Sequence, residues 1–165
     1  MTKVFIAHNI LVRARRNYSP LPKMNVEFLK VDGREVEYQK LSSLTKKNTL
    51  VLLHEGLGCV ELWERFPQKL SEVFNTTIFT YSRFGYGASS PVSLPRSLDY
   101  HSEEALTWLS KILDKANISD CILVGHSDGA SIALIYAGKV RDPRIKGLVL
   151  LSPHVKVEEK TVCQI

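Results

Sequence analysis

The sequence predicts an α/β fold in which parallel strands alternate with helices that cover both faces of one sheet. Short, continuous apolar runs predict strands that are buried on both faces. Between these runs, apolar residues recur at helical spacing, which indicates amphipathic helices. The beginning of the pattern differs, because two segments that alternate apolar and polar residues flank an Asp32-Gly33 pair. We therefore expect an antiparallel β-hairpin followed by a parallel sheet.

The hairpin is the first element with a clear pattern. An Asp-Gly pair favours the positive φ values that a two-residue hairpin turn requires. Apolar residues lie on both sides of the pair, at Val26, Phe28, Leu29, Val31, Val36 and Tyr38. Residues 49–53 follow as an almost wholly apolar run, which is typical of a buried central strand.

Strands and helices alternate through the rest of the chain. Pro67 interrupts the helical spacing of residues 62–74, so we expect a kink or a new helix start at that point. Residues 83–97 are rich in Gly, Ser and Pro and predict a long loop. The other segments, in order, are a strand at 76–81, a helix at 105–113, a strand at 121–124, a helix at 130–137 and a strand at 147–151.

The net charge of +5 comes from the N-terminal end of the chain. Residues 27–165 contain 17 basic and 17 acidic side chains, and every charged residue before them is basic. A neutral folded part does not support a nucleic-acid-binding face. Because folded-type patterning begins only after Pro22, we expect a basic extension at residues 1–23 and the domain at residues 24–165. Such an extension either is simply solvated or binds an anionic surface.

The sequence predicts no cofactor, no metal ion and no membrane span. The three cysteines, Cys59, Cys121 and Cys163, are too far apart for a C-x-x-C or Cys/His metal site. We interpret them as reduced thiols and expect a cytoplasmic protein. The apolar stretch at residues 4–12 is interrupted by His8 and Asn9 and is too short to span a bilayer.

The clearest candidate for chemistry is Gly125-His126-Ser127-Asp128-Gly129, between a predicted strand and a predicted helix. A G-x-S-x-G in this context is typical of a nucleophile elbow, where the serine occupies a strained turn and glycines allow close backbone approach. The N-terminal end of the following helix favours negative charge at the same place. Ser127 is thus a candidate nucleophile, and the alternative is a serine that only caps the helix.

Four segments in this order resemble the N-terminal part of an α/β-hydrolase of the serine hydrolase type. They are the loop His54-Glu55-Gly56-Leu57-Gly58, the turn at residues 81–89, the elbow at residues 125–129, and the strand with its exit loop at residues 147–154. The resemblance implies an incomplete α/β-hydrolase fold that contains strands 1 to 6 and the start of the lid. It also implies a small-molecule acyl substrate and no cofactor.

The resemblance further implies an oxyanion hole. The backbone N–H of Asp128 would pair with that of Gly56, or alternatively of Leu57, to hold the negative oxygen of a tetrahedral intermediate. Glu55 stands where many family members have Gly, and its carboxylate would either orient a substrate or repel an anionic one. Arg83 corresponds to an arginine with a structural role, which bonds backbone carbonyls and is not catalytic.

The acid and the base of a catalytic triad are the missing parts. Family members place them after the elbow in the order Ser, Asp or Glu, His. His154 is the only histidine after Ser127, and it lies just past the strand at residues 147–151, so it is a candidate base in an unusual position. Glu158 and Glu159 are candidate acids or, alternatively, the start of a lid. The remaining histidines are not expected to act as the base: His8, His54, His101 and His126.

The pattern is compatible with three functions. The first is a serine hydrolase that cleaves an ester, thioester, amide or carbon–carbon bond, with weak or no turnover from a chain truncated before the usual acid and base. The second is a catalytically silent domain that binds a ligand or an interaction partner. The third is half of a split hydrolase. The strand at residues 147–151 would have a bare edge, which a second chain or a second copy would cover.

Overall fold

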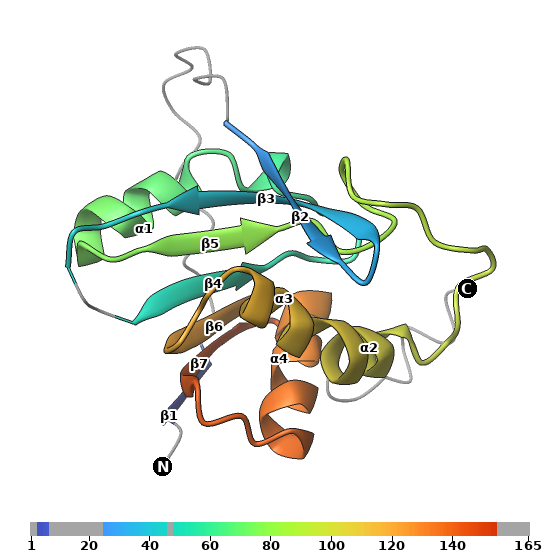
Figure 1. Cartoon of the computed structure of the whole chain (residues 1–165). Helices are drawn as coiled ribbons and strands as arrows, with labels where there is room; N and C mark the ends of the chain where they lie inside the picture. Colours follow the sequence, from blue (N-terminus) through green and yellow to red (C-terminus); the bar gives the residue numbers. More distant parts are fainter. Residues whose placement is uncertain (1–2, 7–24, 46–47, 155–165) are drawn as a thin grey trace.

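The strands of the computed structural model, which describes residues 3–6, 25–45 and 48–154, form one seven-stranded sheet. Their bounds are β1 Lys3–Ile6, β2 Glu27–Val31, β3 Arg34–Leu41, β4 Thr49–Leu53, β5 Ile78–Tyr81, β6 Cys121–His126 and β7 Ile145–Leu151. Their order is β1-β7-β6-β4-β5-β3-β2 (Figure 1). β3 is antiparallel to both its neighbours, and all other pairs are parallel, which confirms the predicted class.

The predicted hairpin is formed by β2 and β3. Its turn places Asp32 at φ 49° and Gly33 at φ 80°, the positive values that an Asp-Gly pair accepts. Val31 and Arg34 face each other as the last pair before the turn. The hairpin adds an antiparallel extension to one side of the parallel strands, away from the strands that carry the predicted elbow.

Helices cover both faces of the sheet (Figure 1). They are the short 3-10 turn η1 Glu61–Trp63, α1 Phe66–Phe74, α2 Tyr100–Glu103, the π-helical turn η2 Glu104–Trp108, α3 Leu109–Lys115 and α4 Asp128–Lys139. The helix restart expected at Pro67 is confirmed, because Pro67 lies in the first turn of α1, where its missing N–H costs nothing. The helix expected at residues 105–113 is longer in the structure, because α2, η2 and α3 follow one another without a break.

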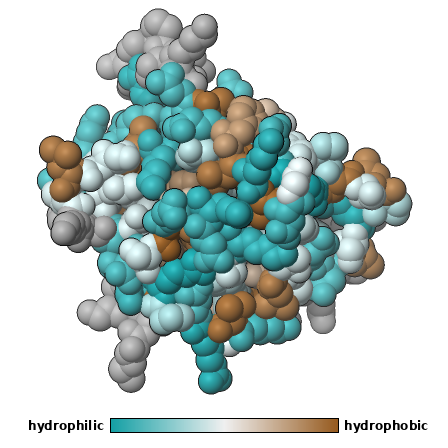
Figure 2. Space-filling model, in the orientation of Figure 1, coloured by the Kyte–Doolittle hydropathy of each residue, from teal (hydrophilic) through white to brown (hydrophobic). Residues whose placement is uncertain are grey.

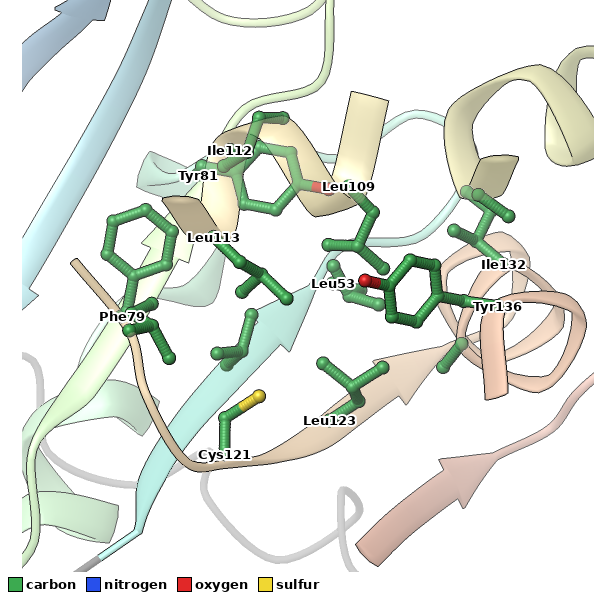
Figure 3. Close-up of a cluster of buried hydrophobic side chains, with 14 of the residues drawn as sticks. Leu53, Phe79, Tyr81, Leu109, Ile112, Leu113, Cys121, Leu123, Ile132 and Tyr136 are labelled. Carbon is green, nitrogen blue, oxygen red and sulfur yellow. The ribbon is translucent and has the colours of Figure 1, made fainter. Parts of the chain in front are cut away.

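Two hydrophobic clusters, one on each face, explain the continuous apolar runs of the sequence. Successive side chains of a strand point to opposite faces. Accordingly Leu53 packs in the larger cluster, with Leu109 and Tyr136 of the helices above it (Figure 3). Its neighbour Leu52 packs in the smaller cluster, with Trp63. A strand with helices on both sides therefore needs an apolar residue at every position.

β1 corrects the expectation that the strand at residues 147–151 has a bare edge. β1 pairs in parallel with β7, with Lys3 opposite Gly147 and Ile6 opposite Leu150. The sequence does not reveal this pairing, because β1 is short and its partner is at the other end of the chain. Residues 3–6 of the predicted extension thus belong to the sheet, whereas residues 7–23 lie outside the described part. The edge strands of the described sheet are β1 and β2.

The hydrophobic side chains on one face of the surface lie in small, separate groups (Figure 2). On the face drawn in Figure 2 they are scattered among hydrophilic residues, as is normal for the outside of a folded domain. The most exposed large hydrophobic side chains come from three loops: Leu44, Leu57, and the pair Leu94 and Leu98 in the loop between β5 and α2. No helix of the described ranges is long and apolar enough to cross a membrane.

Candidate active site

Four loops meet where the parallel strands end. Because β4, β5, β6 and β7 run in the same direction, their carboxyl ends lie at one edge of the sheet. The loops that follow them carry Glu55, Arg83, Ser127 and His154 respectively. This edge is where ligands bind in open α/β sheets. The strand directions therefore gather the four segments that the sequence singled out.

Ser127 occupies the sharp turn between β6 and α4. Its backbone has φ 51° and ψ −114°, a combination that is strained for any residue with a side chain. Two hydrogen bonds fix this turn: the Ser127 N–H donates to the Leu151 carbonyl at 2.8 Å, and the Ser127 carbonyl accepts from the Ala130 N–H at 3.0 Å. Ser127 is also the N-cap of the twelve-residue helix α4, whose positive end faces the site.

Gly125 and Gly129 are required because the backbone passes too close to both. A Cβ on Gly125 would lie 2.4 Å from the Gly129 carbonyl oxygen. A Cβ on Gly129 would lie 2.0 Å from the Leu53 carbonyl oxygen in β4. Either contact is far shorter than van der Waals distance, so the strand–turn–helix arrangement accepts only glycine at these positions. The G-x-S-x-G pattern therefore has the structural context that the sequence analysis expected.

His154 lies beside the proposed nucleophile. Its Nε2 is 2.8 Å from Ser127 Oγ, a distance typical of a hydrogen bond between a serine nucleophile and its base. Ser152, at φ 51°, turns the chain after β7 so that His154 returns over the elbow. The backbone of His154 is bound by Ser131 of α4, whose Oγ accepts the His154 N–H at 2.9 Å. The histidine that the sequence placed in an unusual position thus reaches Ser127.

The loop after β4 approaches the elbow closely. A Cβ on Gly56 would lie 3.0 Å from Asp128 Oδ2, so Gly56 packs directly on the residue that follows Ser127. The Glu55 carboxylate accepts the Leu57 N–H at 2.6 Å. This bond engages the Leu57 N–H within its own loop, which favours Gly56 over Leu57 as an oxyanion donor. It also shows that Glu55 stabilises the loop.

Arg83 binds the backbone carbonyls of this loop, which is the structural role that the resemblance implied. Its guanidinium is fully buried and donates to the His54 carbonyl at 2.5 Å and to the Glu55 carbonyl at 3.0 Å. The Arg83 N–H donates to His54 Nε2 at 3.0 Å, so the second ring nitrogen, Nδ1, is the donor to the Glu55 carbonyl at 2.7 Å. Burial and the nearby Arg83 charge lower the pKa of His54 to about 3, so this histidine is neutral and structural.

Asp128 connects the elbow to α2, a contact that the sequence did not indicate. Tyr100 OH donates to Asp128 Oδ2 at 2.5 Å, and His101 Nε2 lies 3.3 Å from Asp128 Oδ1. Burial raises the pKa of Asp128, but the hydrogen bond from Tyr100 and the close contact with His101 outweigh it, so the net pKa is lowered. His101 carries no motif, and only the folded loop before α2 brings it to the site.

A buried glutamate, Glu104, lies in η2 behind Arg83. Its Oε1 accepts a long hydrogen bond of 3.4 Å from Arg96, and its Oε2 is buried without a partner among the described residues. Burial raises the pKa of Glu104 to about 7, although the positive charges of Arg83 and Arg96 oppose this. The apolar spacing that predicts the helix at residues 105–113 carries no signal for a buried glutamate at position 104.

Four residues that the sequence analysis discussed lie outside the described residues: the candidate acids Glu158 and Glu159, the thiol Cys163, and His8, which was not expected to act as the base. Glu158, Glu159 and Cys163 lie in residues 155–165, and His8 lies in residues 7–24. In the part of the chain that is described, no group of three or more His, Cys, Asp or Glu side chains gathers at a distance suited to a metal ion.

Comparisons with known proteins show the family and the fold of this chain. A family model described as the alpha/beta hydrolase fold matches residues 48–162. The (lyso)-N-acylphosphatidylethanolamine lipase of Bos taurus is 33% identical over 110 residues, which are 67% of this chain and 31% of that protein. Epoxide hydrolase 3 of Xenopus tropicalis is 28% identical over 130 residues, 77% of this chain and 34% of that protein. The chain thus spans about a third of the length of the curated relatives it matches.

Solved structures share the same fold. The thioesterase domain from the curacin biosynthetic pathway superimposes with a TM-score of 0.66 at 25% identity, covering 87% of this chain and 51% of that one. The haloalkane dehalogenase DatA of Agrobacterium tumefaciens C58 gives a TM-score of 0.67 at 17% identity, covering 90% of this chain and 50% of that one. Because the family model matches well over half of the chain, this chain belongs to the alpha/beta hydrolase fold family.

Proposed function

We propose that this chain is a serine hydrolase of small acyl compounds in which Ser127 is the nucleophile and His154 the general base. The observation that carries the proposal is the 2.8 Å contact between Ser127 Oγ and His154 Nε2 on a strained strand-to-helix turn. A serine hydroxyl is a weak nucleophile on its own and needs a base within hydrogen-bond reach. A serine that only capped α4 would not need this contact.

The first half of the reaction forms an acyl-enzyme. Ser127 Oγ attacks the substrate carbonyl carbon while its proton passes to His154 Nε2. The carbonyl oxygen becomes an oxyanion, which accepts hydrogen bonds from the backbone N–H groups of Asp128 and Gly56. When the tetrahedral intermediate collapses, the bond to the leaving group breaks, and protonated His154 returns the proton to that group.

The second half releases the acid. A water molecule gives its proton to His154 Nε2 and attacks the acyl carbon through its oxygen. The second tetrahedral intermediate uses the same two N–H donors. Its collapse breaks the bond to Ser127 Oγ, which regains the proton from His154, so the enzyme ends as it began.

Relatives support acyl chemistry as the substrate class. One curated relative is named a lipase, and one structural neighbour is a thioesterase domain. Esters and thioesters are therefore the first substrates to test. The epoxide hydrolase among the relatives shows that this fold also performs other hydrolyses, but a serine at the elbow favours attack on a carbonyl.

The third member of the proposed triad is the acid that would orient His154 through its Nδ1. Glu158 and Glu159 follow His154 within a few residues and are the candidate acids. If either one acts, replacing it by glutamine should reduce turnover on the order of 10³- to 10⁴-fold, the effect of losing the acid of a Ser-His-Asp triad.

Covalent labelling of Ser127 tests the proposal. A fluorophosphonate should add one adduct to the intact chain, located at Ser127 by peptide mass spectrometry, and Ser127→Ala should abolish it. Ser71→Ala, which removes a helix serine on the opposite face of the sheet, is the matched control and should label normally. Hydrolysis of p-nitrophenyl acetate should be lost in both Ser127→Ala and His154→Gly, and free imidazole should partly restore it only in His154→Gly.

Two outcomes would contradict this proposal, the first in favour of a silent binding domain and the second in favour of another base. If the wild-type chain neither labels nor hydrolyses the ester, the elbow does not carry an active nucleophile and the proposal is wrong. If His154→Gly labels and hydrolyses at the wild-type rate, Ser127 depends on another base, and the assignment of His154 is wrong.

A further inference from the structure

The hydroxyl of Ser131 contacts the backbone of both proposed catalytic residues. Ser131 lies one helical turn after Ser127 on α4, and residues at i and i+4 lie on the same helix face. The His154 N–H donates to Ser131 Oγ at 2.9 Å. The hydroxyl proton has two carbonyl acceptors within reach, that of His154 at 3.3 Å and that of Ser127 at 3.4 Å. One side chain therefore connects the turn of the nucleophile to the loop of the base.

This connection matters because His154 itself is exposed. Ser131 is 5% exposed and has a fixed environment inside the fold, whereas His154 lies at the surface. An exposed imidazole is not enclosed by neighbouring side chains, so its place depends on how its backbone is bound. The hydrogen bonds that the described residues make to the His154 backbone come from Ser131.

We propose that Ser131 is a positioning residue that keeps His154 at hydrogen-bond distance from Ser127. The inference rests on the proposed function, because the position of His154 affects turnover only if His154 is the base. In this role Ser131 touches neither the substrate nor the transferred proton. It acts as the outer partners of metal-bound histidines do, by fixing the place of a group that reacts.

Removal of the hydroxyl should reduce turnover without changing substrate binding. In Ser131→Ala the His154 N–H loses its acceptor, and the loop after β7 can move away from the elbow. A displacement of about 1 Å between reacting groups can cost ~10- to 100-fold in kcat. KM should stay within about twofold of the wild-type value, because no substrate contact is removed. Ser131→Thr retains the hydroxyl and should retain most of kcat.

A double-mutant cycle distinguishes positioning from a general structural role. If Ser131 acts through His154, the variant Ser131→Ala/His154→Gly should have the same kcat as His154→Gly alone, both without imidazole and with it. Ser71→Ala is the control, since Ser71 Oγ also donates to a backbone carbonyl, that of Thr76 at 3.0 Å. The Ser71→Ala variant should lose a comparable free energy of unfolding and should keep the wild-type kcat. Ser131→Cys, which retains a weak donor and acceptor, is a second conservative variant if the threonine does not fit.

The outcomes identify which idea fails. The inference is overturned if Ser131→Ala turns over at the wild-type rate while Ser127→Ala and His154→Gly are inactive. It is also overturned if the losses of Ser131→Ala and His154→Gly multiply in the double variant, because Ser131 would then act independently of His154. If His154→Gly retains the full rate, the assignment of the base fails, and the role of Ser131 fails with it.

Discussion

We expect the ionisation of Glu104 to lower the free energy of unfolding as pH rises from 5 to 8, and Glu104→Gln should remove this contribution. The carboxyl is 2% exposed, and its single described hydrogen bond, from Arg96, is long at 3.4 Å. Burial raises its pKa from 4.5 to about 7. Glutamine cannot ionise, keeps a carbonyl oxygen as an acceptor for Arg96, and has nearly the same shape.

The size of the effect follows from proton linkage. Below pH 4.5 the glutamate is protonated in both the folded and the unfolded chain, so it contributes no pH dependence. Between pH 4.5 and about 7 only the unfolded chain ionises, so the free energy of unfolding falls as pH rises. Integrated from pH 5 to pH 8, this one group costs about 2.5 kcal/mol of stability.

Urea unfolding followed by tryptophan fluorescence at pH 5 and pH 8 measures the difference. The wild-type free energy of unfolding should fall between the two pH values by about 2.5 kcal/mol more than that of Glu104→Gln. The control is Glu103→Gln, which removes an exposed carboxylate one position earlier and should change the difference by less than about 0.5 kcal/mol. If wild type and Glu104→Gln lose the same free energy, Glu104 is already ionised in the folded protein at pH 5 and the reasoning is refuted.

Three further expectations concern other parts of the fold. Gly129→Ala should destabilise the protein by about 3 kcal/mol or more in thermal unfolding, because its Cβ would lie 2.0 Å from the Leu53 carbonyl oxygen; Gly138→Ala on the same helix, with nothing within 4 Å, should instead stabilise it by about 0.5–1 kcal/mol. The ¹⁵N NMR signals of the His54 ring should keep their neutral pattern at pH 5, since its pKa is about 3, and titration near pH 6 would contradict its burial. Because only the unfolded chain takes up this proton, stability should fall as pH drops from 6.5 towards 3. Deletion of residues 1–6 should lower Tm by roughly 3 °C or more and cause concentration-dependent association in size-exclusion chromatography; an unchanged Tm would show that β1 adds nothing to the sheet.

The fold could be predicted where the sequence pattern is local. The turn at Asp32-Gly33, the apolar strand at residues 49–53 and the helix restart at Pro67 each follow from the chemistry of adjacent residues, and the structure confirms all three. β1 could not be predicted in the same way. A four-residue edge strand carries almost no periodic signal, and its pairing with β7 depends on residues at the far end of the chain.

The site could likewise be predicted only where its residues belong to a local sequence pattern. Ser127 lies in a contiguous motif, and His154 stood out as the only histidine after it. Tyr100 and His101 reach Asp128 only through the course of the long loop before α2, which no pattern in the sequence describes. Ser131 has a signal in the sequence, because it is the one hydroxyl side chain in the first half of α4, at the i+4 position from Ser127.

The pairing of β1 with β7 affects how this chain is made. Of the strands that the structure describes, β1 is synthesised first and its partner β7 last. At a synthesis rate of about 5–20 residues per second, β1 waits roughly 7 to 30 s before β7 is made. Closing a loop of nearly the whole chain also costs about 4 kcal/mol of entropy, so this contact forms after the local ones. Among the described strands, β1 is therefore expected to join the sheet last, and until then its backbone can bind chaperones or other nascent chains.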